Sequence, residues 1–267
     1  MRVLVTGSSR GIGASIARRL AAEGADVAIT ARTLEAHPTL PGSLQRTAAA
    51  LAVHGRRVGV VVADLLDEAD RARIVPEAVA ALGGPIDVLV NNAAAAIYQP
   101  VAEMSLKRRR LLFEANVHAP LDLAQAVLPG MLAAGRGWIV NVSSGSAELW
   151  DGPPFATGIT GSTITMYGAS KAAQNRWTNG LAAEIANAGV RVNSVQPRAA
   201  VMSEGADALV GGRLRPDQIE SMEEMVEAAV YLCDCPADTT GRITVSLDLI
   251  AELGLVVRDL DGGDRVV

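Results

Sequence analysis

Two kinds of stretch alternate along the chain. Short runs rich in Val and Ile are almost continuously apolar, which is typical of strands buried on both faces of a parallel sheet. The strands predicted in this way are Val3–Thr6, Asp26–Ala31, Arg57–Val62, Asp87–Val90, Gly137–Val142, Val190–Val195 and Arg242–Ser246. Longer stretches rich in Ala and Leu lie between them. The helices that they predict are Gly11–Glu23, Ser43–His54, Asp67–Leu82, Ser105–Ala134, Tyr167–Ala188 and Met222–Cys233.

This alternation over the whole length predicts a single α/β domain with a doubly wound, parallel, seven-stranded sheet and helices on both faces. No repeat and no Pro-, Gly- or Ser-rich linker divides the chain. We therefore assign residues 1–257 to one domain and 258–267 to a polar, mobile C-terminal tail. Long loops in a compact domain are usually functional lids or disordered segments. The irregular stretches are Thr33–Gly42, Gly145–Thr165 and Arg198–Asp217.

Composition narrows the class of protein. The 267 residues are 49% hydrophobic and 20% charged, with a net charge of −5, so a buried core is expected and disorder is excluded for most of the length. A pI near 5.3 argues against a nucleic-acid partner. No apolar run is long enough for a membrane span, and the N-terminus enters a strand without a signal peptide. We expect a cytoplasmic protein.

Cysteines and histidines give no sign of a metal site. Cys233 and Cys235 are too close in sequence to bridge each other readily, and the three histidines are scattered along the chain. Only two lysines, Lys107 and Lys171, stand against 22 arginines. The basic run that begins at Lys107 is best interpreted as a solvated helix face.

A glycine-rich turn joins the first predicted strand to the first predicted helix. Glycines there permit a close approach of the backbone to a phosphate, and the helix N-terminus offers free N–H groups. A plain loop is the alternative, but the position at a strand-to-helix switch favours a dinucleotide site. The turn residues predicted to bind this cofactor are Thr6, Gly7, Ser9, Arg10, Gly11, Ile12 and Gly13.

The second predicted strand ends at Ala31-Arg32. An acidic residue at this point would bind the ribose 2′-OH of NAD, whereas an Arg suits the 2′-phosphate of NADP. Arg10 can supply a second guanidinium to the same phosphate. Two solvated surface arginines are the alternative. We expect NADP(H) as the cofactor, with NAD(H) less favoured.

The sharpest signal is Tyr167-Gly168-Ala169-Ser170-Lys171. Tyr and Lys four positions apart in a helix lie on one face. A phenol exchanges a proton near neutral pH when its pKa falls from about 10 towards about 7, and a nearby ammonium, assisted by an oxidised nicotinamide ring, favours this shift. We predict Tyr167 as the general acid/base, and Lys171 as the group that lowers its pKa and holds the nicotinamide ribose. The alternative is a core Tyr beside a surface Lys.

Ser144 ends the fifth predicted strand, and ligands bind at the carboxyl ends of parallel strands. A hydroxyl there can polarise a substrate carbonyl. Ser143 and Ser146 are rivals for this role.

The G-x-x-x-G-x-G spacing of the turn and the Tyr167–Lys171 pair resemble the classical short-chain dehydrogenase/reductase family, from Val3 to about Leu247. The resemblance implies a Rossmann-type fold and favours Ser144 among the serines. It also implies that Asn116 is catalytic and bends its helix around a water that feeds protons to Lys171; a buried Asn at a kink is the alternative. The cofactor contacts implied are Asp64 and Leu65 at the adenine, Asn92, Ala93 and Ala94 near the ribose, and Pro197 at the nicotinamide.

The alternative interpretation of Asp64 is a helix N-cap. Two departures from the family stand out. Ser144 and Tyr167 lie 23 positions apart, further than in typical members, and the insertion Ala147–Gly161 carries Trp150 and Phe155. These aromatics suggest an apolar substrate wall or lid, or a surface loop packed on another subunit. Arg198 replaces the glycine that follows the family's proline.

Arg198 and the segment His37–Gly42 resemble a branch of hydroxysteroid-dehydrogenase-like proteins and citronellol-type alcohol dehydrogenases. The expected function is that of an NADP(H)-dependent oxidoreductase acting on a hydrophobic alcohol, ketone or aldehyde, in a homotetramer or homodimer packed through helices that include Trp177. The main alternative is a low-activity NADP(H)-binding sensor of the same fold. A dehydratase or epimerase is weaker, because those relatives usually carry a longer substrate domain.

Overall fold

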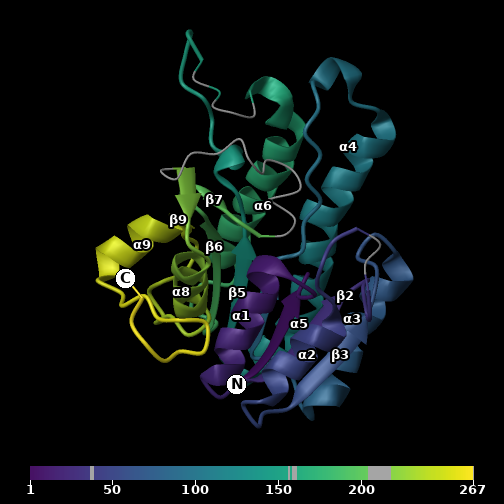
Figure 1. Cartoon of the computed structure of the whole chain (residues 1–267), viewed down its shortest axis with the longest axis vertical. Coiled ribbons are helices and arrows are strands. Elements are labelled where there is room, and N and C mark those ends of the chain that lie inside the picture. Colours follow the sequence, from purple (N-terminus) through teal and green to yellow (C-terminus); the bar gives the residue numbers. More distant parts are fainter. Residues whose placement is uncertain (37–38, 156, 158–160, 204–217, 267) are drawn as a thin grey trace.

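The computed structural model describes residues 1–36, 39–155, 157, 161–203 and 218–266. Its main sheet contains the strands β1 (Arg2–Thr6), β2 (Asp26–Ala31), β3 (Val58–Val62), β4 (Val88–Asn91), β5 (Gly137–Val142), β6 (Val190–Gln196) and β9 (Ile243–Val245). They pair in parallel in the order β3-β2-β1-β4-β5-β6-β9 (Figure 1). The strand order reverses beside β1, so the predicted doubly wound seven-stranded sheet is confirmed.

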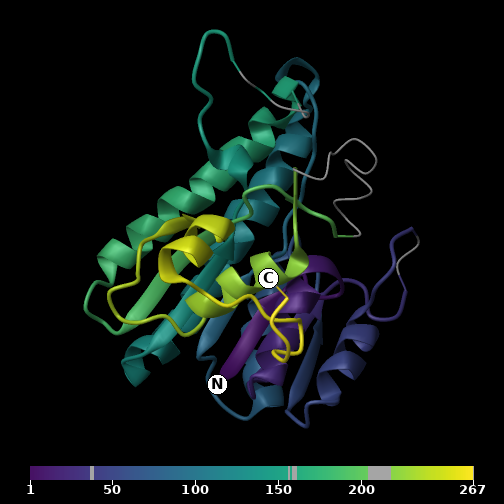
Figure 2. The ribbon, with the colours of Figure 1, turned by 60° about the vertical axis from the view of Figure 1, so that its left-hand side comes forward.

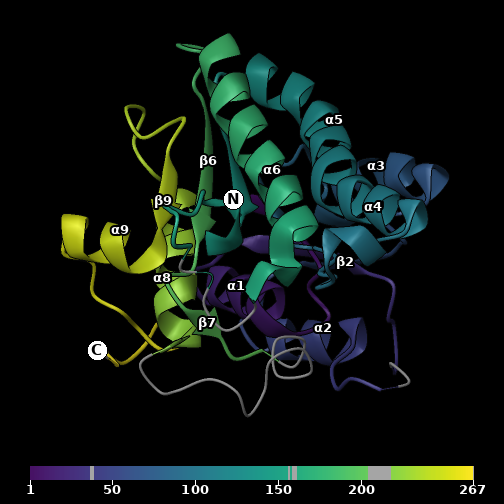
Figure 3. The same ribbon diagram turned by 90° about the horizontal axis from the view of Figure 1, so that it is seen from above.

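Helices cover both faces of this sheet, as Figure 3 shows from above. One face carries α1 (Gly11–Ala22), α2 (Leu44–Ala52), α8 (Met222–Leu232) and α9 (Ser246–Leu253). The other face carries α3 (Glu68–Leu82), α5 (Ala119–Ala134) and α6 (Thr165–Glu184). Side chains alternate between the two cores along β1: Val3 and Val5 pack into the first and Leu4 into the second. The sheet is therefore buried on both faces, as its apolar strands predict.

The single helix predicted over residues 105–134 is wrong. The structure has α4 (Leu106–Phe113), a π-helical segment η2 (Glu114–His118) and then α5. Asn116 lies in η2 and uses its side-chain amide on the backbone of Ala95, which holds the helix in its widened turn. The helix α9 was also missed, because Ser246 begins it where the sequence predicted the end of a strand.

Short elements occupy the carboxyl side of the sheet. They are η1 (Val101–Glu103), η3 (Gly145–Ala147), η4 (Gly161–Ile164) and the parallel pair β7 (Ala200–Val201) and β8 (Ile219–Glu220). The last two lie at the ends of a stretch predicted to be irregular, Arg198–Asp217, of which residues 204–217 are outside the described part.

The C-terminal segment, predicted to be a polar, mobile tail, contains a hydrogen-bonded turn. The Asp259 carboxylate accepts hydrogen bonds from the backbone N–H groups of Asp261, Gly263 and Asp264. Asp261 also pairs with Arg18 of α1. Local carboxylate-to-backbone bonds of this kind order a polar turn without a large apolar contact.

Candidate active site

A cleft of about 1010 Å³ runs along the carboxyl edge of the sheet. The predicted residues that line it are Gly7, Ser9, Arg10, Gly11, Ile12, Arg32, Asp64, Leu65, Asn92, Ala93, Ala94, Ser144, Tyr167, Lys171 and Pro197. Thr6, Gly13 and Asn116 are not among the lining residues. These three residues lie behind the residues that line the cleft, and their contacts show the role of each.

Thr6 ties the first strand to the fourth. Its hydroxyl oxygen accepts hydrogen bonds from the backbone N–H groups of Asn92 and Ala93, both at 3.0 Å. The Asn92 side chain returns a bond to the Thr6 carbonyl at 2.9 Å. We refer to Thr6, Gly7, Asn92 and Ala93 as the floor of the cleft.

Glycine is required at two positions, one in the floor and one beneath it. A Cβ on Gly7 would lie 2.7 Å from the Ala93 Cα, and the φ of Gly7 is +65°. A Cβ on Gly13 would lie 2.3 Å from the Asn92 Nδ2. The first turn of α1 is thereby packed close against the start of the segment after β4, with its free N–H groups at the cleft.

This region fits a dinucleotide phosphate. Arg10 donates its Nε–H to the Pro41 carbonyl at 2.9 Å, while its Nη2 is buried and has no partner among the described residues. An unpaired guanidinium N–H beside a helix N-terminus and a glycine turn has the chemistry of an anion site. The residues present therefore fit the cofactor that the sequence predicts.

Arg32 and Asp64 face each other across the outer end of the cleft, 3.7 Å apart. Both side chains are well exposed, so this ion pair is weak. Asp64 also accepts a hydrogen bond from the Leu66 backbone, whereas the N-cap of α3 is Asp67. The alternative interpretation of Asp64 as the cap of this helix is therefore wrong.

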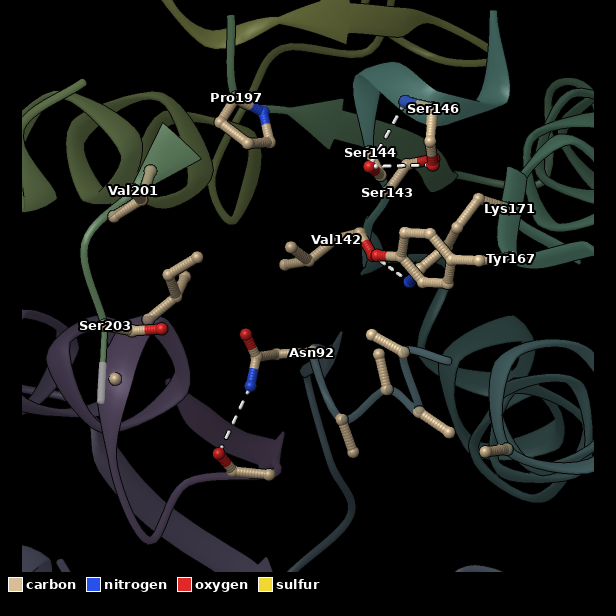
Figure 4. Close-up of a pocket in the computed structure, with 18 of the residues that line it drawn as sticks. Asn92, Val142, Ser143, Ser144, Ser146, Tyr167, Lys171, Pro197, Val201 and Ser203 are labelled. Atoms are coloured by element: carbon tan, nitrogen blue, oxygen red, sulfur yellow. Dashed lines mark hydrogen bonds between the residues drawn. The ribbon is translucent and has the colours of Figure 1, made fainter. Parts of the chain in front are cut away.

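Three of the predicted catalytic side chains meet at the other end of the cleft (Figure 4). Ser144 follows β5 and lies beside the phenol of Tyr167 from α6, where its side chain lowers the pKa of that phenol. Ser146 donates to the Ser144 hydroxyl oxygen at 3.0 Å, while the buried Ser143 hydroxyl has no partner in the described chain. Among the three candidate serines, Ser144 is therefore the one that acts on the phenol.

Lys171 lies one helical turn beyond Tyr167 and is 1% exposed. Its ammonium donates to the Val142 carbonyl at 2.8 Å and to the side-chain oxygen of Gln174 at 3.1 Å. Burial lowers the pKa of Lys171 to about 7. A charged amine in this position is therefore held by neutral carbonyl groups rather than by a carboxylate.

The pKa of the Tyr167 phenol is shifted in the direction opposite to the one predicted from the sequence. Burial, followed by the neighbouring Tyr98 phenol, raises the pKa of Tyr167 to about 12, and the Ser144 side chain only partly opposes this. The two tyrosine rings lie 5.7 Å apart. Desolvation outweighs the stabilisation that the sequence led us to expect from Lys171, because no other described residue places a positive charge beside the phenol.

Asn116 is fully buried behind this group. Its Oδ1 accepts from the Ala95 N–H at 2.8 Å, and its Nδ2 donates to the Ala95 carbonyl and to Ser170 Oγ, each at 2.9 Å. These bonds join η2 to the helix that carries Tyr167 and Lys171. The widened turn predicted around Asn116 is present, and its place in a proton relay stays a prediction.

Sequence reasoning missed several lining residues, chiefly Tyr98, Glu148 and Ile164. Tyr98 had a weak signal, as one of three tyrosines in the chain. The insertion contributes Trp150 to the cleft, whereas Phe155 is 60% exposed on a loop that projects beyond α6 (Figure 2). Residues 156 and 158–160 of the insertion, and residues 37–38 of the proposed branch motif, lie outside the described residues.

Two general properties bear on the site. Within the described ranges, no group of three or more His, Cys, Asp or Glu side chains is arranged to hold a metal ion. The described helices include none that is both long and apolar enough to cross a membrane.

Comparison with known proteins agrees with this geometry. Residues 1–205 match the family model for short chain dehydrogenase. Hydroxysteroid dehydrogenase-like protein 2 of Danio rerio is 30% identical over 97% of this chain and 59% of its own length, so the chain spans about three fifths of that relative.

Solved structures give the same result. A short chain dehydrogenase from Mycobacterium thermoresistibile superposes with a TM-score of 0.82 at 29% identity, covering 98% of this chain and 91% of that one. A Beutenbergia cavernae protein described as an NAD(P) dependent gluconate 5-dehydrogenase, solved with bound NADP, has a TM-score of 0.76 at 31% identity, covering 91% and 94%. Because the family model matches most of this chain, the chain belongs to the short-chain dehydrogenase family of oxidoreductases.

Proposed function

We propose that this protein is an NADP(H)-dependent oxidoreductase that interconverts a carbonyl and an alcohol on a hydrophobic small molecule. The observation that carries the proposal is that Ser144, Tyr167 and Lys171 line one end of the same cleft as the glycine turn. A proton donor and an anion site in one cleft are what a nicotinamide-dependent reduction needs.

In this mechanism the substrate oxygen lies between Ser144 and Tyr167. Ser144 donates a hydrogen bond that polarises the carbonyl, and Tyr167 gives its proton to the oxygen as the carbon is reduced. A nicotinamide cofactor, when bound, would supply or accept the hydride, and the positive charge of its oxidised form would favour the phenolate. Lys171 would stabilise the phenolate and donate a hydrogen bond to the cofactor ribose. Asn116 would support the relay that supplies protons to Lys171. Alcohol oxidation runs the same proton path in reverse.

The preference for NADP(H) rests on Arg10 and Arg32 at the outer end of the cleft. Arg10 has an unused buried N–H, and Arg32 is 65% exposed on its side chain, so both can turn towards a 2′-phosphate. The similar Beutenbergia protein was solved with NADP. NAD(H) is the less favoured cofactor. The predicted contacts at Asp64, Leu65, Ala94 and Pro197 belong to the same proposal.

A hydrophobic alcohol, ketone or aldehyde is the proposed substrate class. Leu111, Trp150 and Ile164 line the catalytic end of the cleft, and large apolar side chains there favour an apolar group on the substrate. Two of the three similar proteins named above carry steroid-type and sugar-acid names, so a polar sugar acid belongs in the same assay. We further propose a cytoplasmic homotetramer or homodimer, with the half-buried Trp177, whose Nε1 has no partner among the described residues, near the subunit contact.

A low-activity sensor that binds NADP(H) is the second candidate. The raised pKa of Tyr167 favours it, since a phenol near 12 gives up its proton reluctantly. The two candidates differ in turnover. The enzyme oxidises NADPH with at least one carbonyl in a broad panel, whereas the sensor binds NADPH and turns over none.

Tyr167→Phe tests the catalytic assignment. We expect turnover to fall about 1000-fold, because the proton donor is lost, with NADPH affinity changed by less than about threefold. Tyr231→Phe removes the same hydroxyl from α8 and is the matched control. Absorbance at the NADPH band gives turnover, and fluorescence titration gives affinity. Retained turnover in Tyr167→Phe would refute the proton-donor role.

A further inference from the structure

A buried amide lies beside the amine of the catalytic group. Gln174, three positions after Lys171 in α6, is 1% exposed, and its side-chain oxygen accepts a hydrogen bond from the Lys171 ammonium at 3.1 Å. We propose that Gln174 is a positioning residue that holds the Lys171 amine, in its charged form, at the wall of the cleft. The inference deepens the proposed function, and it rests on that function where turnover is concerned.

Counting donors supports this role. An ammonium has three N–H donors and no acceptor. Val142 takes one at 2.8 Å and Gln174 takes a second, so one N–H is left for the cleft that Lys171 lines (Figure 4). Because two N–H groups of the ammonium are held from two directions, the third N–H is directed towards the cleft. A lysine held by Val142 alone could rotate about that single bond.

The turn of α6 that carries Gln174 is itself fixed to the sheet. Thr178 donates its hydroxyl to the Gln174 carbonyl at 2.8 Å, and Asn141 of β5 donates its amide to the Thr178 oxygen at 2.8 Å. Asn91 of β4 in turn donates to Asn141 at 2.9 Å. A buried polar chain therefore runs from β4 and β5 to the segment of helix that holds the amine, and hydrogen bonds linked in this way favour one geometry.

The surroundings of Lys171 explain why a neutral acceptor matters. Its titratable neighbours at the site are phenols: Tyr167 on its own helix, and Tyr98, whose ring packs on Tyr167 from the segment after β4. Burial is what lowers the pKa of Lys171, and among the described residues no carboxylate offsets it. Carbonyl oxygens from Val142 and Gln174 are left to favour the ammonium. Loss of one of them makes the neutral amine more common near pH 7.

The lysine content of the chain allows a direct test. Only Lys107 and Lys171 are present, so protein labelled with 13Cε-lysine gives two side-chain signals, and Lys107→Arg assigns them. Lys107 is exposed and serves as an internal reference. In Gln174→Met, which keeps the size but removes the acceptor, we expect the pKa of Lys171 to fall by about one unit while that of Lys107 is unchanged.

Two more variants separate the acceptor from packing. Gln174→Asn withdraws the oxygen by one methylene group and is also expected to lower the pKa of Lys171, so it decides the question if Gln174→Met does not fold. Gln174→Glu keeps an oxygen in place and is expected to leave that pKa unchanged or raise it. Gln45→Met makes the same change on the exposed face of α2 and is the control for turnover and stability.

The two proposals fail in different ways. An unchanged Lys171 titration in folded Gln174→Met, or in Gln174→Asn where the first does not fold, overturns the positioning role. So does a fall in Gln174→Glu equal to that in Gln174→Met. Absence of turnover in the wild-type protein, with a lysine titration that responds as expected, refutes the proposed enzyme and leaves the positioning role intact. With turnover present, the high-pH fall in activity is expected to move to lower pH in Gln174→Met by the same shift as the NMR titration.

Discussion

The floor of the cleft and its rim are built on different principles. The floor, Thr6, Gly7, Asn92 and Ala93, consists of buried or half-buried groups with fixed hydrogen-bond partners and almost no spare volume. The rim, residues Glu148–Phe155, is exposed throughout and stands on a projecting loop (Figure 2). A methyl group on Gly7 would disturb the first, whereas in the second the side chains of Leu149 and Phe155 lie largely in solvent.

This difference separates cofactor binding, the constant part of the chemistry, from substrate choice, the variable part. Cofactor binding needs backbone N–H groups placed with little tolerance, and close packing supplies that. Substrate choice needs a surface that can change without loss of the fold, and an exposed loop supplies it. Substitutions in the floor should therefore affect stability and cofactor binding together, whereas substitutions in the rim should affect substrates alone.

Gly7→Ala should have the largest effect on the fold. The added Cβ meets the Ala93 backbone at 2.7 Å, and the positive φ adds strain, so we expect the free energy of unfolding to fall by about 3 kcal/mol. NADPH binding should be lost as the turn moves. Urea unfolding and fluorescence titration measure the two effects.

Gly24→Ala is the matched control for this change. Gly24 also has a positive φ, +90°, but its Cβ would meet nothing within 4 Å. We expect a loss of about 1 kcal/mol from strain alone, with cofactor binding preserved. Equal losses in the two variants would show that the close approach to Ala93 is not what makes Gly7 necessary.

Arg32→Ala should have the next largest effect, at the outer end of the cleft. Loss of one guanidinium is expected to lower kcat/KM for NADPH about 10- to 100-fold and to leave that for NADH within about threefold. Arg56→Ala is the control, because Arg56 pairs with Asp26 and does not line the cleft. A uniform decrease with both cofactors would count against 2′-phosphate recognition.

Sequence patterns were sufficient for the sheet and for the glycine turn, whereas Asn92 and Ala93 of the floor were predicted through the resemblance. Continuous apolar strands, the glycine turn and the Tyr167–Lys171 spacing are local features, and local features survive in the folded chain. The break at Asn116 was predicted by resemblance alone. The break is held by hydrogen bonds from Asn116 to Ala95 and Ser170. These residues lie 21 and 54 positions from Asn116 in the sequence, so no local pattern predicts the bonds.

The electrostatics of the site were harder to predict. A Tyr–Lys spacing gives distance along a helix but not depth, and depth decides the pKa of Tyr167 and Lys171 here. Gln174 was missed for the same reason, since a Gln in a helix is ordinarily a surface residue. Tyr98 and Glu148 reach the cleft through tertiary folding that no periodicity predicts.

Trp150→Ala should have the smallest effect, confined to substrates. Trp150 lines the cleft and is 37% exposed, so its removal costs part of an apolar contact. We expect KM for large hydrophobic carbonyls to rise about three- to tenfold, with the free energy of unfolding within about 0.5 kcal/mol of the wild-type value. Leu149→Ala is the neighbouring control, because Leu149 is 95% exposed and does not line the cleft. If Trp150→Ala instead lowered stability as much as a change in the floor, the rim would be a structural part of the domain, and its separation from the floor would have to be abandoned.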